Sequence, residues 1–414
     1  MTAPRRIGLV GYFGAGNTGN EASLRAVLDH LGRAPSADRL VVLCADASVV
    51  SAEHGVPADQ LWPRVRATRD GGRRPLWRRA WTRLGTIPRV WRLVGRVDAL
   101  VVPGTGVLES ILCTSIWTVP YTLFLVALVA RVRGRPFMLL NVGAQEPATL
   151  RMRLLCTGIA RLATAATARD EESARVIQRL RPRGGVVEHG PDVAFGFRSP
   201  AQVSTSVPGR VVVGVMRYSG GFGDRRPDEV LAERYDAAIV QLLARLLDDG
   251  RTLRVLVGDL SDLGLAASLV EQARAARPGI DPDRVAVSGA RTFEETLREM
   301  AEAEVVVASR FHNVIAALKV CRPVLGLGYA PKHLALLQRF GLAEHRQTLD
   351  DIDVERALAS VRQLTAEGPV WAAHCAGELR AVEAELERSL ARVDAIVVGT
   401  SALEKPAGRS DGTA

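Results

Sequence analysis

Cysteine and lysine are both scarce in this chain of 414 residues. The five cysteines are odd in number and never form a CxxC pair, which argues against a disulfide framework and against a zinc site. No group of histidines and acids has metal-ligand spacing either, so we expect no metal. Scattered free thiols suit a reducing cytosol. The cysteines are Cys44, Cys113, Cys156, Cys321 and Cys375, and the lysines are Lys319, Lys332 and Lys405.

A signal-peptide core is also missing, because residues 1–6 lead straight into a predicted strand. We therefore expect a cytoplasmic protein. One uncharged run, Ile111–Ala130, is long enough to span a bilayer. Pro120 at its middle, several Ser and Thr residues, and its place between two predicted strands indicate instead a helix buried under a sheet.

The positive charge is concentrated in residues 64–96, which contain eleven arginines and a single acid, Asp70. Trp77 and Trp81 share one face of a predicted helix there, a pattern typical of basic segments at a membrane interface. A solvated helix in an arginine-rich protein has the same composition, so both interpretations stay open. If the segment binds lipid, the protein is peripheral at the inner face of the membrane. Nucleic acid is not an expected partner, since no DNA- or RNA-binding motif accompanies the charge.

Strands and helices alternate along the chain in two successive halves. The length suggests two domains of roughly 200 residues each. The alternation predicts an α/β fold of two Rossmann-like, doubly wound domains that face a cleft. We place the N-terminal domain at 1–198, the C-terminal domain at 209–349, C-terminal helices at 350–400 and a disordered tail at 401–414.

The predicted strands are Arg6–Val10, Leu40–Ala45, Ala99–Val102, Phe137–Val142, Val211–Met216, Leu253–Val257, Val285–Val287, Val305–Ala308 and Pro323–Gly328. The predicted helices include Asn20–Leu31, Glu171–Leu180, Asp228–Leu247, Gly264–Ala276, Phe293–Ala303, Asn313–Val320 and Ala372–Val393.

Polar residues with the chemistry of an anion site follow the strands of the second half. Arg310 and His312 come directly after the buried strand Val305–Ala308, and Lys332 follows the next strand. Arg217 follows the first strand of this half. Because parallel strands end at one edge of a sheet, we expect these side chains to meet in the cleft. A guanidinium recognises anionic oxygens and an imidazole can move a proton near neutral pH.

A glycine loop opens the first helix. Gly14–Gly19 fits the GxGxxG pattern after a strand and before a helix. Asp46, the acid that would hold a ribose, lies about thirty residues on, where about twenty is expected. The loop also carries polar Asn17 and Glu21, so a dinucleotide site is a weak interpretation. In either case, the glycines let the backbone approach a ligand, and the helix N-terminus favours an anion or a hydrogen-bonding group.

Six motifs in order resemble those of the polysaccharide pyruvyl transferases and extend over roughly residues 6 to 345. They are Gly11–Ala22, Arg169–Ser173, Asp192–Phe195, Gly214–Arg217, Ser309–His312 and Tyr329–Lys332. The resemblance implies a two-domain fold similar to the GT-B glycosyltransferases. It also implies transfer of a pyruvyl group from phosphoenolpyruvate to two hydroxyls of a glycan or lipid-linked saccharide, in cell-surface polysaccharide or glycolipid biosynthesis. Phosphoenolpyruvate would be a co-substrate, with no further cofactor.

Roles for individual residues combine the motifs with this chemistry. We expect His312 to be catalytic, with His333 as the rival histidine. Phosphoenolpyruvate carries a phosphate and a carboxylate, which Arg217, Arg310 and Lys332 could hold. The acceptor sugar is expected at Asn17, Glu21, Gly104 and Gly106 of the first domain, where short polar side chains and backbone amides suit a neutral polyol.

The sequence departs from the family pattern at three places, which concern the acceptor side more than the donor side. Asn20 stands where the family often has Asp, Pro103–Gly106 replaces a triple-glycine turn, and Ala330 replaces an aspartate.

Other functions remain alternatives at this point. A GT-B glycosyltransferase or epimerase that uses a nucleotide sugar would share the fold, with Asp259, Glu294 or Glu295 as the acid that holds a ribose. A nicotinamide oxidoreductase built on the glycine loop and a non-catalytic glycan-binding protein are the others.

Overall fold

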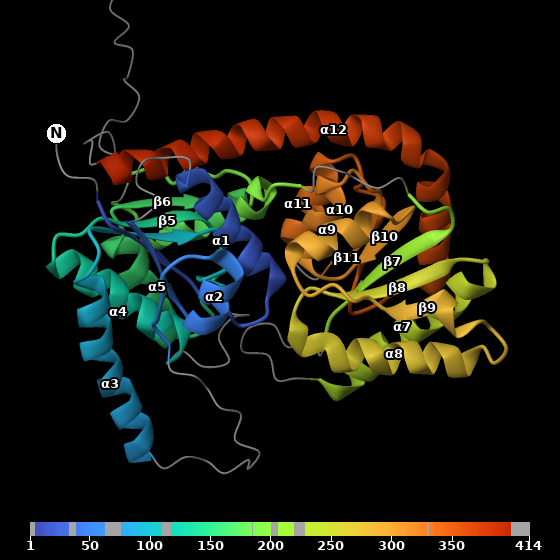
Figure 1. The fold of residues 1–414 in the computed structure, drawn as a ribbon, viewed down its shortest axis with the longest axis horizontal. Coiled ribbons are helices and arrows are strands. Elements are labelled where there is room, and N and C mark those ends of the chain that lie inside the picture. The colour runs from blue at the N-terminus through green and yellow to red at the C-terminus, as the bar shows by residue number, and fades with distance from the viewer. Residues whose placement is uncertain are drawn as a thin grey trace, which may run out of the picture. The chain divides into compact units, whose positions relative to one another are not determined.

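The computed structural model describes residues 5–32, 39–62, 76–109, 117–183, 185–199, 206–218, 228–328 and 331–398, with the side chains of 76–84, 331 and 397–398 outside that description. These residues form two six-stranded sheets in which every strand pair is parallel, with helices between successive strands (Figure 1). The predicted α/β fold of two Rossmann-like domains is therefore confirmed.

The first sheet has the strand order β3-β2-β1-β4-β5-β6. Its β-branched central strands are buried on both faces, as expected of a sheet that helices cover on two sides. The strands are β1 (Ile7–Val10), β2 (Leu40–Cys44), β3 (Ala58–Gln60), β4 (Ala99–Pro103), β5 (Phe137–Val142) and β6 (Ala165–Ala168). The helices are α1 (Thr18–Leu31), α2 (Ala47–His54), α3 (Leu76–Val94), α4 (Val119–Val132), α5 (Leu150–Leu162) and α6 (Glu171–Leu180).

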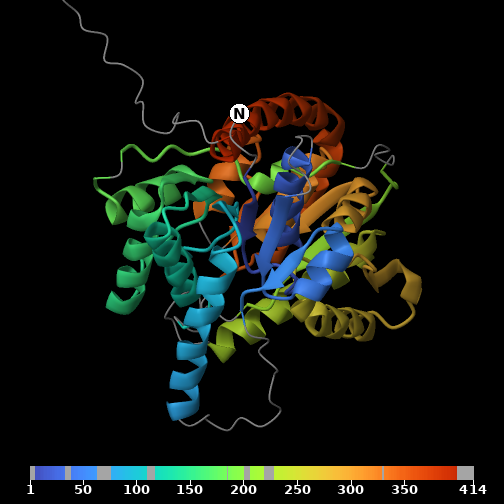
Figure 2. The ribbon, with the colours of Figure 1, turned by 60° about the vertical axis from the view of Figure 1, so that its left-hand side comes forward.

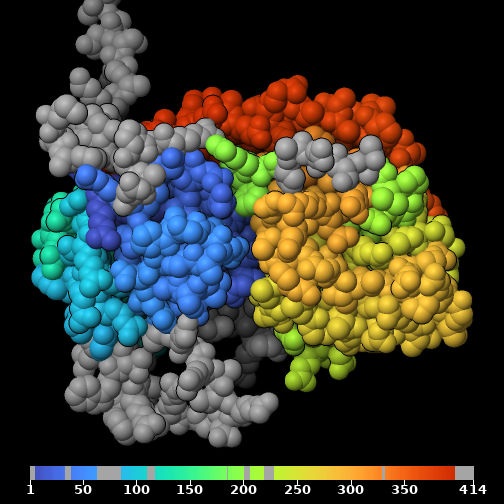
Figure 3. All heavy atoms as spheres, in the orientation of Figure 1, coloured from blue at the N-terminus to red at the C-terminus, as the bar shows by residue number. Residues whose placement is uncertain are grey.

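The second sheet has the order β12-β11-β10-β7-β8-β9. Its strands are β7 (Arg210–Val215), β8 (Thr252–Val257), β9 (Val285–Val287), β10 (Val305–Ala308), β11 (Val324–Gly328) and β12 (Arg346–Thr348). The helices are α7 (Glu229–Asp248), α8 (Leu263–Ala276), α9 (Phe293–Ala301), α10 (Phe311–Lys319), α11 (Pro331–Arg339) and α12 (Val354–Val398). Residues around α8 and α9, yellow to orange in Figure 3, form much of the visible surface of this half.

The chain divides into two compact units, each built around one sheet. The first contains Met1–Gly14, Val27–Asp192 and Glu385–Ala414, and the second contains Ala15–Ala26 and Val193–Ala384. The predicted bounds differ from these units at three places. They set residues 350–400 apart as C-terminal helices, and they assign to the first domain both residues 193–198 and the glycine loop with the start of α1. Backbone hydrogen bonds to residues after β8 attach this segment to the second unit.

Several predicted segments fall partly outside the described residues. The uncharged run from 111 to 130 continues as helix α4 from Val119, whose inward face is buried. The backbone of the basic segment is helical from Leu76 to Val94, and the side chains of Trp77 and Trp81 are not described. The tail 401–414 also lies outside, as do residues 200–205 of the segment between the two predicted domains. Within the described residues, no helix is both long and apolar enough to cross a membrane.

Helix α12 is one continuous helix where a group of C-terminal helices is predicted. In the second unit it packs against the end of α10 through two thiols. The Sγ of buried Cys375 lies 3.4 Å from the carbonyl oxygen of Leu318. Half-buried Cys321 follows α10 with a positive φ of 50°. A hydrogen bond from Cys375, then the nearby Arg322 and Lys319 charges, lower the pKa of Cys321 to about 7, and the same pairing raises that of Cys375.

We expect iodoacetamide to alkylate Cys321 with a half-maximal rate near pH 7, whereas an ordinary thiol requires a pH of about 8.5. Replacing Cys375 with Ala removes the hydrogen bond that stabilises the thiolate, so the midpoint should move to higher pH. Peptide mass spectrometry after timed alkylation measures both. An unchanged midpoint in the Cys375→Ala protein would contradict the pairing.

Candidate functional site

The polar residues predicted after the strands of the second half do emerge at one sheet edge. Strands β7 and β10 are adjacent and parallel, with Ala308 opposite Gly214. Arg217 therefore leaves the sheet beside Arg310, and β8 and β11 end at the same edge. This edge, in the second unit, is the candidate site.

Asp262 joins the two arginine segments. Its buried carboxylate accepts from Nε of Arg310 at 2.9 Å and from a second guanidinium nitrogen of the same side chain. The other oxygen accepts from the backbone N–H of Arg217 at 3.2 Å. The Arg217 side chain is exposed and close enough to Asp236 to lower the pKa of that carboxyl, against the larger effect of burial, which raises it. Asp262 thus fixes the direction of Arg310.

A second set of bonds holds the ends of β7 and β10 together. The buried hydroxyl of Tyr235 accepts from the backbone N–H of Met216 at 3.3 Å and lies 3.3 Å from Oγ of Ser309. Burial raises the pKa of Tyr235 to about 12, so the phenol stays protonated and can donate to Ser309. Tyr235 thus links Ser309, the residue before Arg310, to the backbone at the end of β7.

Asn313 lies between two glycines at this edge. It is 1% exposed, and its Nδ2 has no hydrogen-bond partner among the residues that the structure describes. A Cβ at Gly214 would come within 2.7 Å of that nitrogen, and a Cβ at Gly258 within 2.8 Å of Oδ1. A Cβ at Gly258 would also meet Cδ of Arg310 at 2.9 Å. These glycines make room for the amide and the arginine.

The glycine loop of the first helix binds to this edge. The backbone N–H and the hydroxyl of Thr18 both donate to the carbonyl of Gly258 at 3.1 Å. Leu260 N–H donates to the carbonyl of Gly16 at 3.0 Å. The amide of Asn17 donates to Asp259 at 3.3 Å, and its Oδ1 accepts from Asn20 N–H at the start of α1. The start of α1 is therefore part of the site.

His312 lies against the first turn of α1. A Cβ on Gly19 would lie 2.0 Å from Cγ of the imidazole and 2.1 Å from Nδ1, so only glycine fits. Phe311 lies beside His312 with its ring centroid 5.9 Å away. The glycine of the loop thus sets the position of the imidazole from one side and the phenylalanine from another.

Replacing Gly19 with Ala should reduce turnover by about 10²-fold, because the new Cβ displaces His312 by an ångström or more. The same change inside a helix ordinarily adds about 0.4–1 kcal/mol of stability. Gly377 in α12 is the matched control, since a Cβ there meets nothing within 4 Å. Steady-state kinetics and thermal melts of both variants measure this. Full activity in the Gly19→Ala protein would contradict the contact.

Lys332 lies at the start of α11, where its Nζ is 5.1 Å from the ring centroid of Phe311. His333 is buried, and its ring lies 5.3 Å from that of Phe311. Phe311 therefore contacts His312, His333 and Lys332, which brings a second cation and both candidate histidines to one place. Tyr329 and Ala330 lie outside the described residues.

The other residues predicted to bind the acceptor lie in both units. Glu21, in the first turn of α1, is buried in the second unit. Gly104 and Gly106 follow β4 in the first unit, where Gly104 has a φ of 52°. A Cβ on Gly106 would meet the carboxylate of Glu109 at 2.8 Å. The turn therefore lies over a buried charge.

That charge belongs to an ion cluster at the end of the first sheet. Arg169 is buried and contacts Glu109, and its Nη1 lies 3.3 Å from Asp192. Two of these residues, Arg169 and Asp192, belong to the sequence motifs. Their ion pairs join the loop after β4, the end of β6 and the segment after α6.

The acids considered for a nucleotide ribose have structural partners. Asp259 caps the turn Leu260–Asp262 by accepting from Ser261 N–H at 3.0 Å. Glu295 forms a capping box with Thr292, and Glu294 pairs with Arg298 one turn on. Sequence reasoning missed Asp262, Asn313 and Glu109, which no motif distinguishes from other polar residues near strand ends.

Comparison with known proteins agrees with this architecture. The family model described as polysaccharide pyruvyl transferase matches residues 17–331. None of the curated proteins compared with the chain matches it significantly.

Solved structures share the fold over nearly the whole chain. The Anabaena protein Alr3699/HepE, in complex with UDP-glucose, is 13% identical, with a TM-score of 0.60 over 96% of this chain and 99% of that one. A UDP-GlcNAc 2-epimerase from Neisseria meningitidis, bound to UDP-GlcNAc, is 10% identical, with a TM-score of 0.56 over 95% and 99%. A glycosyltransferase from Rickettsia africae is 9% identical, with a TM-score of 0.57 over 95% and 99%. At such identities the likeness shows the fold alone, which is the two-domain GT-B type.

Proposed function

Because this chain belongs to the polysaccharide pyruvyl transferase family, and is therefore a transferase, we propose that its donor is phosphoenolpyruvate and its product a cyclic pyruvate ketal on a saccharide. One observation carries the proposal: Arg310, His312 and Lys332 lie together at one sheet edge. His312 and Lys332 lie beside the ring of Phe311, and Asp262 holds Arg310. Cations and a proton-transfer group are what this donor requires.

The donor would bind through charge-assisted hydrogen bonds. Asp262 bonds two nitrogens of Arg310 and so leaves Nη1 of the guanidinium for the phosphate or the carboxylate of the donor. Lys332 adds a point charge beside Phe311, and the exposed Arg217 can reach a bound anion from the end of β7. The Asn313 amide is a further buried donor at this edge.

His312 would transfer the protons. In the first step, the imidazolium protonates the methylene carbon of phosphoenolpyruvate, and the positive charge develops on the carbon that carries phosphate. A sugar hydroxyl adds to this carbon and returns its proton to the imidazole. Phosphate then leaves with a proton from the imidazolium, and a second hydroxyl closes the ring and gives its proton to the imidazole. A side chain whose pKa lies near neutrality suits both directions of transfer.

The acceptor would be a glycan or a lipid-linked saccharide. We assign it to Asn17, Glu21, Gly104 and Gly106, and we propose that neither a metal nor a further cofactor takes part. A cytoplasmic site of action, with peripheral membrane contact through residues 64–96, would suit an acceptor that carries a lipid. Nucleic acid plays no role in this proposal.

The test is to incubate the purified protein with phosphoenolpyruvate and a panel of glycosides and lipid-linked saccharides. We expect acceptor-dependent release of phosphate and a product heavier than the acceptor by one pyruvate minus water. UDP-sugars in the same panel test the alternative. Turnover of a UDP-sugar without release of phosphate from phosphoenolpyruvate would refute the proposal and favour a glycosyltransferase or epimerase.

Replacing Glu21 with Ala should raise the KM for the acceptor about tenfold or more, while phosphoenolpyruvate binding stays within a few-fold, since a lost hydrogen bond to one substrate is worth about 1.5 kcal/mol. Initial rates at varied acceptor and isothermal titration with the donor measure the two effects. Equal loss of both substrates would count against a separate acceptor site.

A further inference from the structure

Exposed apolar side chains gather on three consecutive helices of the first unit. Among the residues whose side chains the structure describes, twelve large hydrophobic ones are exposed, and seven of these belong to α3, to α4 with the turn before it, or to α5. Helix α4 packs against both α3 and α5, so the three form one layer (Figure 2). The seven are Ile87, Trp91, Trp117, Leu128, Val132, Leu150 and Leu154.

Helix α5 shows the pattern most clearly. Leu150 and Leu154 are 73% and 63% exposed, one turn apart, and Arg161 follows two turns later on the same face. Arg151 and Arg153 are exposed on either side of the leucines. A helix that presents leucines flanked by arginines to solvent is typical of helices that lie in a membrane interface.

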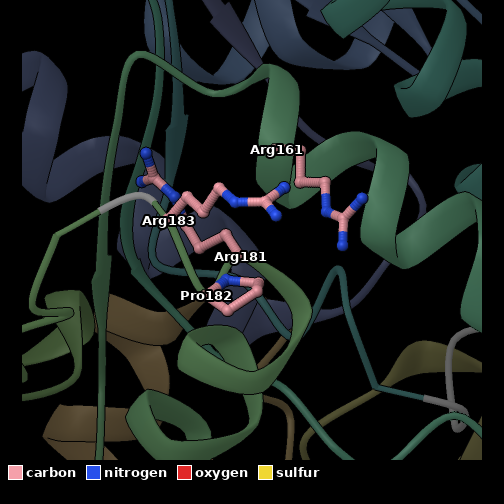
Figure 4. A pocket seen from close by; sticks show the side chains of 4 residues that line it. All are labelled: Arg161, Arg181, Pro182 and Arg183. Carbon is pink, nitrogen blue, oxygen red and sulfur yellow. The ribbon is translucent and has the colours of Figure 1, made fainter.

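An arginine pocket lies at the end of this face. It has a volume of about 320 Å³ and is lined by Arg161 of α5 and by Arg181, Pro182 and Arg183 after α6 (Figure 4). Nε of Arg161 donates to the Leu180 carbonyl at 3.3 Å, and Arg181 donates to the Ala163 carbonyl at 3.3 Å. These two bonds hold the side chains at the ends of both helices.

The pocket lacks a negative charge of its own. Within the described residues, none of its three arginines forms an ion pair with a carboxylate, and burial alone lowers the pKa of Arg181. A guanidinium has five N–H groups, and the bonds to carbonyls use one from each of Arg161 and Arg181. The other donors suit the oxygens of a phosphate.

The surrounding sequence is strongly basic as well. Residues 64–96 and 110–169 together hold eighteen arginines and two acids. Their combined net charge, eighteen minus two or +16, exceeds the net charge of +9 of the whole chain. Exposed arginines lie on the same helices as the exposed apolar residues: Arg89 and Arg92 on α3, Arg131 on α4, and Arg151, Arg153 and Arg161 on α5.

We propose that the outer face of α3, α4 and α5 binds the surface of an anionic bilayer, with the arginine pocket holding the phosphate of a lipid headgroup. Leu150 and Leu154 enter the interfacial layer, and Arg151, Arg153 and Arg183 lie at the level of the headgroups. An anionic membrane is complementary to both features, since it attracts the arginines and takes up the apolar side chains. The inference concerns a surface apart from the candidate site and does not rest on the proposed chemistry.

The experiment is co-sedimentation of the full chain with vesicles of phosphatidylglycerol and phosphatidylcholine, and with vesicles of phosphatidylcholine alone. We expect binding to the anionic vesicles that weakens as salt rises from 50 to 500 mM, and little binding to the neutral ones. Arg151→Gln with Arg153→Gln should weaken partitioning by roughly fivefold per arginine. Leu150→Ser with Leu154→Ser should weaken it by roughly tenfold.

Matched controls are Arg356→Gln with Arg380→Gln, two exposed arginines of α12 in the second unit, and Val230→Ser, an exposed apolar residue of α7. These should bind vesicles like the parent protein. Equal binding to neutral and anionic vesicles, or equal loss in the controls, would overturn the proposal.

Arg183→Gln tests the pocket without removing a bond between the helix ends. It should weaken vesicle binding by roughly fivefold with an unchanged melting temperature. Inorganic phosphate, added at constant ionic strength, should compete for the pocket and lower vesicle binding of the parent protein but not of Arg183→Gln. Phosphate binding in the pocket with no vesicle binding would reject the lipid and leave a site for a free phosphate.

Discussion

The His312→Ala protein is expected to lose about 10²–10⁴-fold in turnover while its affinity for phosphoenolpyruvate stays within a few-fold, because proton transfer contributes to the rate and not to donor binding. Arg310→Ala should have the opposite signature and lose donor binding, since a charge-assisted hydrogen bond contributes roughly 1.5–3 kcal/mol. Single-turnover rates, titration calorimetry with phosphoenolpyruvate and melting temperatures of both variants separate the two roles.

His374→Ala is the control, because this histidine is exposed on α12 and lies outside the candidate site. If His312→Ala folds normally and turns over near the parent rate, His312 is not the proton-transfer group. His333, whose ring centroid lies 5.3 Å from that of Phe311, is then the next residue to replace.

A second large effect is expected on stability. Replacing Arg169 with Ala should lower the free energy of unfolding of the first unit by about 3–5 kcal/mol, because it leaves buried carboxylates without their counter-charge. The side chains of Arg169, Glu109 and Asp192 are 2%, 7% and 2% exposed, so water cannot replace the arginine. Urea unfolding followed by a probe in the first unit measures the change.

Arg175→Ala is the matched control on the neighbouring helix. Arg175 pairs with Glu171 one turn away, but both side chains are more than half exposed, so its loss should cost about 0.5 kcal/mol or less. Similar costs for the two variants would mean that the Arg169 cluster contributes no more than a surface ion pair.

Much of the second sheet could be predicted from local sequence. A continuous, mainly β-branched run such as Val305–Ala308 strongly favours a buried strand. The structure has a buried strand with the predicted bounds, Val305–Ala308. The short elements were harder. The predicted scheme omits β3, β6 and β12, whose sequences Ala-Asp-Gln, Ala-Ala-Thr-Ala and Arg-Gln-Thr lack the apolar β-branched pattern that identifies the equally short β9.

The site could be predicted only in part, because several of its positions depend on contacts between distant segments. Arg310 and His312 follow a recognisable strand. Asp262 does not, since its role depends on β8 and β10 ending at one edge on either side of β7. The contact of Gly19 with His312 joins residues almost three hundred positions apart, and the GxGxxG pattern alone assigns that glycine to a nucleotide.

Because the glycine loop is attached to the second unit, it limits where two members of the family can be joined to make an active chimera. A chimera that exchanges the N-terminal half after residue 192 would take Ala15–Ala26 from one parent and Val193–Ala384 from the other. The bonds of Thr18 to Gly258, and the fit of Gly19 against His312, would then join unmatched partners. Crossovers that keep residues 15–26 with the parent of the second sheet should give active hybrids, and a simple exchange of halves should not.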